Sequence, residues 1–303
     1  MIRDNKLAQY YERCEKMDKP ITAEIFLTDY CNLNCNYCRY AHNTGKWMQF
    51  NDFVAYATRL VQMGVRGIIL TGGGEPTINP HFDKITGWLE RNEIPYGINT
   101  NLVNEVLCKA NFVKVSIDAG DRERYKAIRG KDKLDDVLNH LRDLIEYKKR
   151  CDIDMKIGVQ CVASFNLSDV ESFYNAVKWL DVDYIYIRPI ESQNRKGMSI
   201  DEIKKVLPAE DKRIVYSFKF DLVDYQPSWC VANWSVITVD VDGNVPYCCH
   251  RPTDIVGHVL DINIMDKKKS HHVDMRECEK PCRLSGANNY LESISYERDI
   301  DFI

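Results

Sequence analysis

Short apolar runs alternate with longer segments of helical periodicity over the first two thirds of the sequence. In the segment from Phe53 to Leu60, for example, apolar residues recur at intervals of three and four, which is the spacing of one helix face. Each apolar run is expected to form a strand followed by a helix: residues 21–28, 67–71, 96–100, 112–117, 155–162 and 184–188. Alternating strands and helices form parallel βαβ units with right-handed crossovers. The pattern predicts an α/β fold, a partial (β/α)6 TIM-like barrel that falls short of the eight units of a closed barrel.

The alternation stops near residue 192. The segment that follows is polar, with a helical pattern beginning near Ser199, and is interpreted as a connector. Beyond it, β-like residues flank Asp242-Gly243-Asn244, where glycine supplies the positive φ of a hairpin turn. We expect a small α+β domain here, stabilised by a metal centre because few apolar residues are available for a core. The expected division is an N-terminal extension (1–19), the barrel (20–195), the connector (196–228) and an auxiliary domain (229–303).

Charge and hydropathy exclude several classes of function. Lysine and arginine total 41 against 45 aspartate and glutamate, so the net charge of -4 provides no basic surface for DNA. No segment approaches the roughly 18 apolar residues of a membrane-spanning helix, and the N-terminus lacks the apolar core of a signal peptide. We therefore expect a cytoplasmic protein with no DNA or membrane partner. The run Lys267-Lys268-Lys269 is expected to be solvated surface.

The chain contains 12 cysteines, an unusual number for the reducing cytoplasm, where disulfides do not persist. Cysteines used in such numbers there commonly bind metal. Cys14, Cys108, Cys151 and Cys161 are isolated and are expected to pack as small apolar residues. The function depends on whether the remaining spaced groups bind metal. Those groups are Cys31, Cys35 and Cys38, and Cys230, Cys248, Cys278 and Cys282.

The first group places three thiols within eight residues, directly after the first predicted strand. In a parallel βα fold this loop lies at the carboxyl end of the sheet, where active sites gather. Three thiolates without a fourth nearby suit an iron-sulfur cluster with one iron open to an external ligand. The alternative is a zinc site completed by His42.

The C-x3-C-x2-C spacing of this group, with Tyr37 before its last cysteine, resembles the radical S-adenosylmethionine (radical SAM) enzymes. Gly72-Gly73-Gly74-Glu75-Pro76, after the second predicted strand, is similar to the Gly-Gly-Glu-Pro motif of that family. The resemblance covers roughly residues 20 to 190. It implies a [4Fe-4S] cluster that binds SAM, receives an electron from a donor such as flavodoxin or ferredoxin, and cleaves SAM to a 5'-deoxyadenosyl radical. That radical would abstract hydrogen from a substrate C–H bond.

The same resemblance implies which residues bind SAM. Gly73 and Gly74 would let the backbone approach the ligand, and Glu75 would accept a hydrogen bond from its ammonium group. The backbone of Tyr37 would contact the adenine. The ribose and the methionyl carboxylate would be held by Asn99, Asn101, Ser116 and Arg129. Capping or turn roles for Asn99 and Ser116, and a surface position for Arg129, are the alternatives.

The second cysteine group resembles the auxiliary-cluster domains called SPASM and twitch. Twelve residues separate Cys230 from Gly243, and four more precede Cys248, as in the C-x9-15-G-x4-C opening of those domains. Cys278 and Cys282 supply two further thiols, and no cysteine follows them, which implies a single twitch-like cluster. A second [4Fe-4S] cluster ligated by all four cysteines is suited to electron transfer. Structural zinc held by the same thiolates is the alternative.

The tail most resembles that of the twitch-type aminocyclitol dehydrogenases, the 2-deoxy-scyllo-inosamine dehydrogenases among them. This implies a radical SAM oxidoreductase that oxidises a small polyol, aminosugar or nucleoside, with the auxiliary cluster receiving an electron. A peptide substrate remains a second expectation, although only about twenty residues precede the first strand and leave no room for a peptide-recognition domain. A non-enzymatic iron-sulfur or zinc protein is the third.

Cys249 raises a further alternative, an epimerase in which its thiol returns a hydrogen atom to the substrate. Neighbours on a strand point to opposite faces, so Cys249 is expected to face away from a cluster bound by Cys248. The alternative roles for Cys249 are a small buried residue or a substitute cluster ligand.

Overall fold

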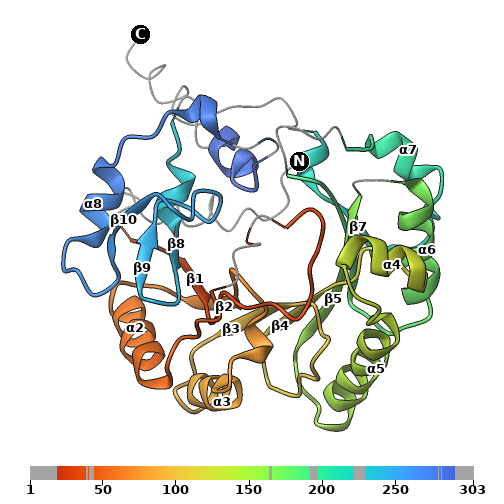
Figure 1. Ribbon diagram of the computed structural model, residues 1–303, viewed down its shortest axis with the longest axis horizontal. Coiled ribbons are helices and arrows are strands. Elements are labelled where there is room, and N and C mark those ends of the chain that lie inside the picture. Colours follow the sequence, from red (N-terminus) through yellow and green to blue (C-terminus); the bar gives the residue numbers. More distant parts are fainter. Residues whose placement is uncertain are drawn as a thin grey trace.

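The computed structural model describes residues 19–38, 40, 44–163, 166–191, 197–221, 229–278, 280 and 282–290. Eight parallel strands form one curved sheet in the order β7-β6-β5-β4-β3-β2-β1-β8 (Figure 1). This confirms the predicted α/β partial barrel, and all six predicted strands are present with ends shifted by at most two residues. The strands are β1 Thr22–Phe26, β2 Gly67–Thr71, β3 Tyr96–Thr100, β4 Phe112–Ser116, β5 Lys156–Ala163, β6 Tyr184–Pro189, β7 Ile214–Tyr216 and β8 Val236–Val239.

Helices cover the outer, convex face of the sheet (Figure 1). The α-helices are α2 Phe50–Gln62, α3 Phe82–Arg91, α4 Arg122–Arg129, α5 Leu134–Arg150, α6 Leu167–Val177, α7 Ile200–Lys204 and α8 Ile264–Ser270. The 3-10 helices are η1 Pro76–Ile78, η2 Phe218–Phe220, η3 Ala232–Ser235 and η4 Met275–Glu277. No helix in this described part is both long and apolar enough to cross a membrane.

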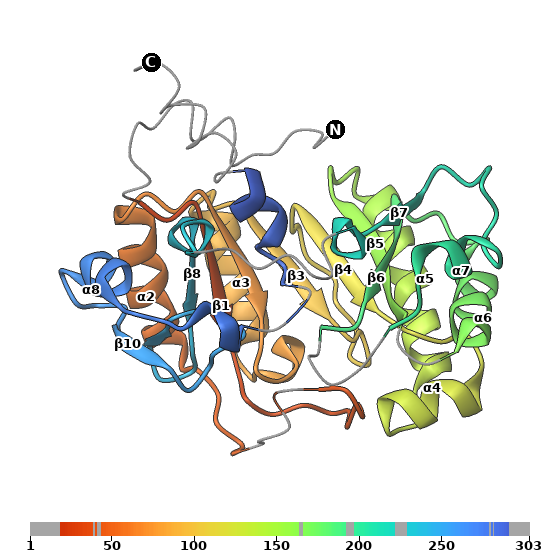
Figure 2. The same ribbon diagram turned by 90° about the horizontal axis from the view of Figure 1, so that it is seen from above.

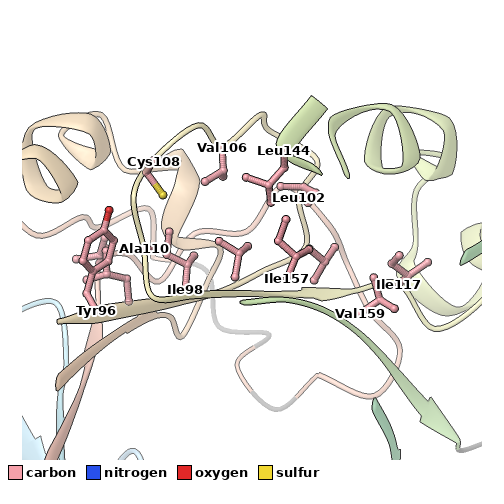
Figure 3. Packing of buried hydrophobic residues seen from close by; sticks show 14 of the residues in the cluster. Tyr96, Ile98, Leu102, Val106, Cys108, Ala110, Ile117, Leu144, Ile157 and Val159 are labelled. Atoms are coloured by element: carbon pink, nitrogen blue, oxygen red, sulfur yellow. The ribbon is translucent and has the colours of Figure 1, made fainter. Parts of the chain in front are cut away.

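The core lies between the sheet and these helices. Ile98 of β3 and Ile157 of β5 point to the same side of the sheet as Leu144 of α5, and all three are fully buried (Figure 3). Burial of such a side chain contributes about 1.5 to 3 kcal/mol. Along β4, buried Val113 and Val115 alternate with half-buried residues, so the intervening side chains point to the concave face. The concave face is therefore available for polar groups.

One predicted helix is missing, because a loop connects β3 to β4. Four buried residues of this loop occupy the place of a helix against the sheet: Leu102, Val106, Cys108 and Ala110 (Figure 3). Cys108 and Cys161 are buried as predicted. Cys151 is exposed where α5 ends, which contradicts the prediction, and Cys14 lies outside the described residues.

Two strands of the sheet come from segments that the sequence pattern did not place there. β7 belongs to the predicted connector, and β8 belongs to the tail and pairs in parallel with β1, with Val236 opposite Thr22. Figure 2 shows β8 beside β1 at one edge of the sheet, with β10 and α8 beyond it. The tail therefore extends the barrel sheet directly.

The predicted turn forms, and Gly243 has φ +84°. The predicted hairpin is wrong, however, because β9 (Asn244–Pro246) pairs antiparallel with β10 (Ile255–His258) rather than with β8. β8 is held by the edge of β1 instead. Ser199 caps α7, whose start was predicted.

Candidate active site

The loop that carries the first three cysteines follows β1 at the carboxyl edge of the sheet. The amides of Asn34 and Asn36 donate to the carbonyls of Arg129 and Ile128, at 3.0 Å each, so the end of α4 holds the loop. Gly130 ends that helix at φ +78°, and a Cβ there would lie 2.4 Å from the carbonyl oxygen of Asn34. The close approach of helix and loop therefore requires glycine.

Nitrogen donors surround the thiols of this loop. The amide of Leu33 lies 3.5 Å from the sulfur of Cys31, and Asn101 Nδ2 lies 3.7 Å from it. Arg129 Nη1 lies 3.3 Å from the sulfur of Cys35. Such donors stabilise iron-bound thiolates and tune the potential of a cluster.

Burial raises the pKa of Cys31 to about 11, and the neighbouring thiols Cys35 and Cys38 contribute to the rise. The three thiols therefore lie close enough to repel one another as thiolates, and bound metal would replace their protons. Three thiols with nitrogen donors fit a [4Fe-4S] cluster with an open iron. His42, the alternative fourth zinc ligand, lies outside the described residues. Among the described residues, no three His, Cys, Asp or Glu side chains are grouped to hold one metal ion.

The glycine loop after β2 packs directly on the cysteine loop. The amide of Gly74 donates to the carbonyl of Thr28 at 2.9 Å, and the amide of Glu75 donates to that of Tyr30 at 2.8 Å. A Cβ on Gly74 would lie 1.9 Å from the Tyr30 carbonyl oxygen. Gly73 has more space, with its nearest neighbour at 3.5 Å. Gly74 is therefore needed for contact between two loops, which the sequence analysis had not anticipated.

Glu75 links the ends of β2 and β3. Its side chain is 3% exposed, and its carboxylate accepts hydrogen bonds from Thr100 Oγ1 at 2.6 Å and from the amide of Asn101 at 2.7 Å. Thr77 donates from both its hydroxyl and its amide. Burial raises the pKa of Glu75, while these hydrogen bonds act in the opposite direction. Three of these four hydrogen bonds go to Oε1 and only the Asn101 amide donates to Oε2, so Oε2 keeps an acceptor position for the predicted contact with an ammonium group.

Arg129 is 4% exposed, so its alternative interpretation as a surface cation is wrong. Its Nε lies 3.1 Å from Asp118 Oδ2, and its Nη2 donates to the carbonyl of Ser116. The hydroxyl of Tyr37 donates to the same Asp118 carboxylate. Asp118 is not among the residues predicted for the site, although an acidic residue directly after a predicted strand was a usable signal. Arg129 thus joins the cysteine loop to the end of β4.

The remaining predicted SAM-binding residues differ in the hydrogen bonds that their side chains already form. Asn99 lines the central cavity, and its buried Oδ1 has no hydrogen-bond partner among the described residues, which fits a ligand donor. Asn101 is occupied by Cys31 and by Asn32, whose Oδ1 lies 2.8 Å away. The Ser116 hydroxyl lies 3.5 Å from Gln160 Nε2, which forms a weak contact.

A cavity of about 510 Å³ lies over the concave face of the sheet, within the size range of small-molecule sites. Its wall combines residues of the cysteine loop, the strands and the tail. They include Tyr37, Cys38, Gly72, Asn99, Lys114, Gln160, Arg188, Glu191, Lys219, Cys249 and Arg283.

The four tail cysteines also lie together. Burial raises the pKa of Cys230 to about 12, and the thiols of Cys282 and Cys248 add to the rise. Burial likewise raises the pKa of Cys278 to about 11, again with contributions from Cys248 and Cys282. Asn288 Nδ2 lies 3.3 Å from the sulfur of Cys230. Cys230 and Cys278 thus each interact with Cys248 and Cys282, and a nitrogen donor lies at Cys230, an arrangement that fits an all-cysteine cluster.

Lys268 corrects the expectation of a solvated lysine run, because it is fully buried. Its ammonium donates to the carbonyl of Val236 at 2.7 Å. Burial lowers its pKa to about 8, while Cys248 and Cys230 act to raise it. A buried cation therefore accompanies the tail thiols.

Cys249 lines the cavity, whereas Cys248 belongs to the tail thiols. The two do not lie on a strand, as the prediction assumed, because β9 ends at Pro246 and a turn follows. The carbonyl of Cys249 accepts a hydrogen bond from the hydroxyl of Tyr40. Burial raises the pKa of the Cys249 thiol, which favours its protonated form.

A parallel partial barrel with a three-cysteine loop at its carboxyl edge defines a radical SAM enzyme. The sequence matches the Radical SAM superfamily over residues 25–176, half of the chain, and the protein belongs to that superfamily. Its cofactors accordingly include SAM and a [4Fe-4S] cluster.

Among curated proteins, a GTP 3',8-cyclase of Clostridium perfringens is 27% identical over 210 residues, which is 62% of each chain. The chain thus spans less than two thirds of that relative. A probable GTP 3',8-cyclase of Pyrococcus abyssi is 34% identical over 137 residues, 41% of this chain and 44% of that protein.

Two solved structures share the fold. SuiB of Streptococcus suis, bound to S-adenosylmethionine, has a TM-score of 0.62 at 14% identity and covers 86% of this chain and 66% of its own. anSMEcpe with bound AdoMet has a TM-score of 0.59 at 16% identity, with coverage of 84% and 81%.

Proposed function

We propose that the protein takes a hydrogen atom from a C–H bond of a small molecule bound in the 510 Å³ cavity. The observation that carries this proposal is that one cavity is lined by both cysteine regions. Cys38 and Tyr37 contribute from the SAM-binding side, and Cys249 contributes from the tail. A substrate held there would be within reach of both.

Each region has a distinct role in this proposal. Cys31, Cys35 and Cys38 would hold the cluster, while Gly73, Asn99 and the braced Glu75 would orient SAM. The bound cofactors supply a 5'-deoxyadenosyl radical when an external donor, such as flavodoxin or ferredoxin, provides an electron. The tail thiolates would hold a second [4Fe-4S] cluster that accepts an electron from the substrate side.

The favoured reaction is oxidation of a hydroxyl-bearing carbon in a sugar, cyclitol or nucleoside. Conversion of such a carbon to a ketone removes one hydrogen atom, one electron and one proton. Cys249 and Arg283, which follow Cys248 and Cys282 directly in the sequence, line the cavity and support this reaction, because an electron acceptor is needed close to the substrate.

Cyclisation of a purine nucleotide is a second candidate. It is favoured by the 210-residue match to a GTP 3',8-cyclase, which extends beyond the length of the superfamily domain. Epimerisation with Cys249 as hydrogen donor is a third candidate, favoured by the position of this residue in the cavity wall.

The first experiment is anaerobic reconstitution followed by iron and sulfide analysis and incubation with SAM and dithionite. We expect about eight irons per chain, and about four in both the C31A/C35A/C38A and the C230A/C248A variants. Only the variant with an intact first group should form 5'-deoxyadenosine. Absence of 5'-deoxyadenosine from fully loaded wild-type protein would refute the proposal.

The C249A variant separates the reactions once a substrate is found. Oxidation should persist without this thiol, whereas epimerisation should stop after hydrogen abstraction. Deuterium incorporated into carbon from D2O would argue against oxidation. Consumption of GTP with formation of a cyclised product would instead establish the second candidate.

A further inference from the structure

Positive charge predominates in the wall of the central cavity. Its cationic side chains come from four different segments: Lys114 from β4, Arg188 from β6, Lys219 from η2 and Arg283 from the tail. Among the described residues, two carboxylates share the wall, Glu24 and Glu191. Topologically distant parts of the chain thus bring their cations to one space.

Both carboxylates are already engaged. Glu191 contacts Lys219, and its oxygens lie 3.3 Å from Arg188 Nη1 and 3.3 Å from His250 Nε2. Although burial acts to raise the pKa of Glu191, Lys219 and Arg188 lower it well below its usual range. Glu24 pairs with Arg283. Two carboxylates are therefore shared among several cations.

Lys114 stands apart from these pairs. The structure gives its ammonium no hydrogen bond or ion pair with any described residue, although the side chain is only half-buried and lines the cavity. Val113 and Val115 on either side point into the core, which fixes the direction of Lys114. Burial, followed by the charges of Arg188 and Lys219, lowers its pKa to about 8. A half-buried cation among other cations is unfavourable unless an anion joins it.

The position of Lys114 is less well explained by a role as counter-charge to the two proposed iron-sulfur clusters. Its strongest charged neighbours are Arg188, Lys219, Glu24 and Arg283, and no cysteine is among them. Lys268, by contrast, has Cys248 and Cys230 as its strongest charged neighbours. Lys114 thus faces the substrate space rather than the thiols.

We propose that Lys114, with Arg188 and Lys219 beside it, binds an anionic group of the substrate, either a phosphate or a carboxylate. This inference rests on the proposed function, because it takes the cavity to be the substrate site. It narrows the substrate from a neutral polyol to an acidic or phosphorylated molecule. Gln160 and Tyr186, which also line the cavity, are placed to contact the rest of such a molecule.

Titration calorimetry of reconstituted protein saturated with SAM tests the proposal at constant ionic strength. Inorganic pyrophosphate represents a phosphate source, and malonate represents a carboxylate source. We expect one of them to bind wild-type protein, and K114M to weaken its affinity about 10- to 100-fold, the effect of losing one charged hydrogen bond. K114R should retain binding within a few-fold. Tighter binding of pyrophosphate would identify a phosphorylated substrate, and tighter binding of malonate a carboxylic acid.

Matched variants distinguish the loss of the Lys114 charge from a loss of folding. K156M removes another lysine from a neighbouring strand, one whose side chain is exposed and 3.5 Å from Asp183, and should leave anion binding unchanged. K114Q supplies a second neutral side chain, and thermal unfolding with iron analysis confirms that each variant is folded. Failure of both anions to bind wild-type protein, or binding by K114M and K114Q as tight as by wild-type protein, would overturn the proposal. Because no turnover is involved, retained anion binding without SAM cleavage would contradict the proposed function alone.

Discussion

Substitution of Gly74 by alanine should separate the two loops that form the proposed SAM site. The new Cβ would lie 1.9 Å from the carbonyl oxygen of Tyr30, a contact that real Cβ atoms make only beyond about 3.0 Å. One backbone must therefore move by about 1 Å. That movement would disturb the hydrogen bonds from Gly74 to Thr28 and from Glu75 to Tyr30.

The expected change in the free energy of unfolding follows from the steric overlap and from the two weakened hydrogen bonds. Overpacking costs about 1 to 3 kcal/mol, and each weakened hydrogen bond adds about 1 kcal/mol. We expect G74A to lower the free energy of unfolding by about 3 kcal/mol and the Tm by about 5 to 10 °C. The cysteine loop should bind iron poorly, so iron content should fall to about four per chain, held by the tail.

G73A is the matched control, because its Cβ would meet its nearest neighbour at an ordinary 3.5 Å. It should keep the wild-type Tm and iron content. If Gly73 faces SAM as proposed, G73A should nevertheless weaken SAM affinity in equilibrium dialysis. Equal Tm and equal iron content in G74A and G73A would refute the steric argument.

Three further substitutions have defined outcomes. D118N leaves the buried guanidinium of Arg129 unpaired and should destabilise the protein by about 3 to 5 kcal/mol in urea unfolding, unless the R129M change is added. D183N removes the partner 2.8 Å from Lys148; although burial acts to raise the pKa of Asp183, that hydrogen bond lowers it. Its stabilisation of about 1 kcal/mol should therefore be present above the unfolded pKa of about 4 and vanish as the pH falls below it. K268M should lower the midpoint potential of the proposed auxiliary cluster in an EPR-monitored redox titration, because a buried cation favours the reduced form; an unchanged potential would contradict this.

The strands of the barrel were predictable because each is a short apolar run, such as residues 67–71, and a helical pattern follows most of them. β8 was recognised as β-like but assigned to a hairpin with the wrong partner. The side chains of β8 are mostly buried on both faces of the strand, so its four residues lack the alternation that would show which strand it pairs with. Its pairing with β1 depends on tertiary contacts made more than 200 residues apart.

In the candidate site too, features set by local sequence were predictable, whereas contacts between distant segments were not. Spacing predicted the three proposed ligands of the first group, because ligands on one loop must be close in sequence, and the resemblance of the tail to auxiliary-cluster domains predicted the other four. The bracing of Glu75 and the pairing of Asp118 with Arg129 could not be read in this way, as they join different strand ends. Lys114 was detectable in principle, since it lies between Val113 and Val115 at a concave position of a predicted strand. Lys268 was hidden in a run of three lysines.

The parallel pairing of β8 with β1 has a consequence for biosynthesis. Until the ribosome has completed the tail, β1 presents an open edge of unpaired amides and carbonyls, a template for association with other chains. The pairing is highly non-local and is expected to form late in folding. The tail therefore covers the open edge of β1, the strand that precedes the first cysteine loop. Truncation before residue 229 should cause aggregation as well as loss of the proposed electron acceptor.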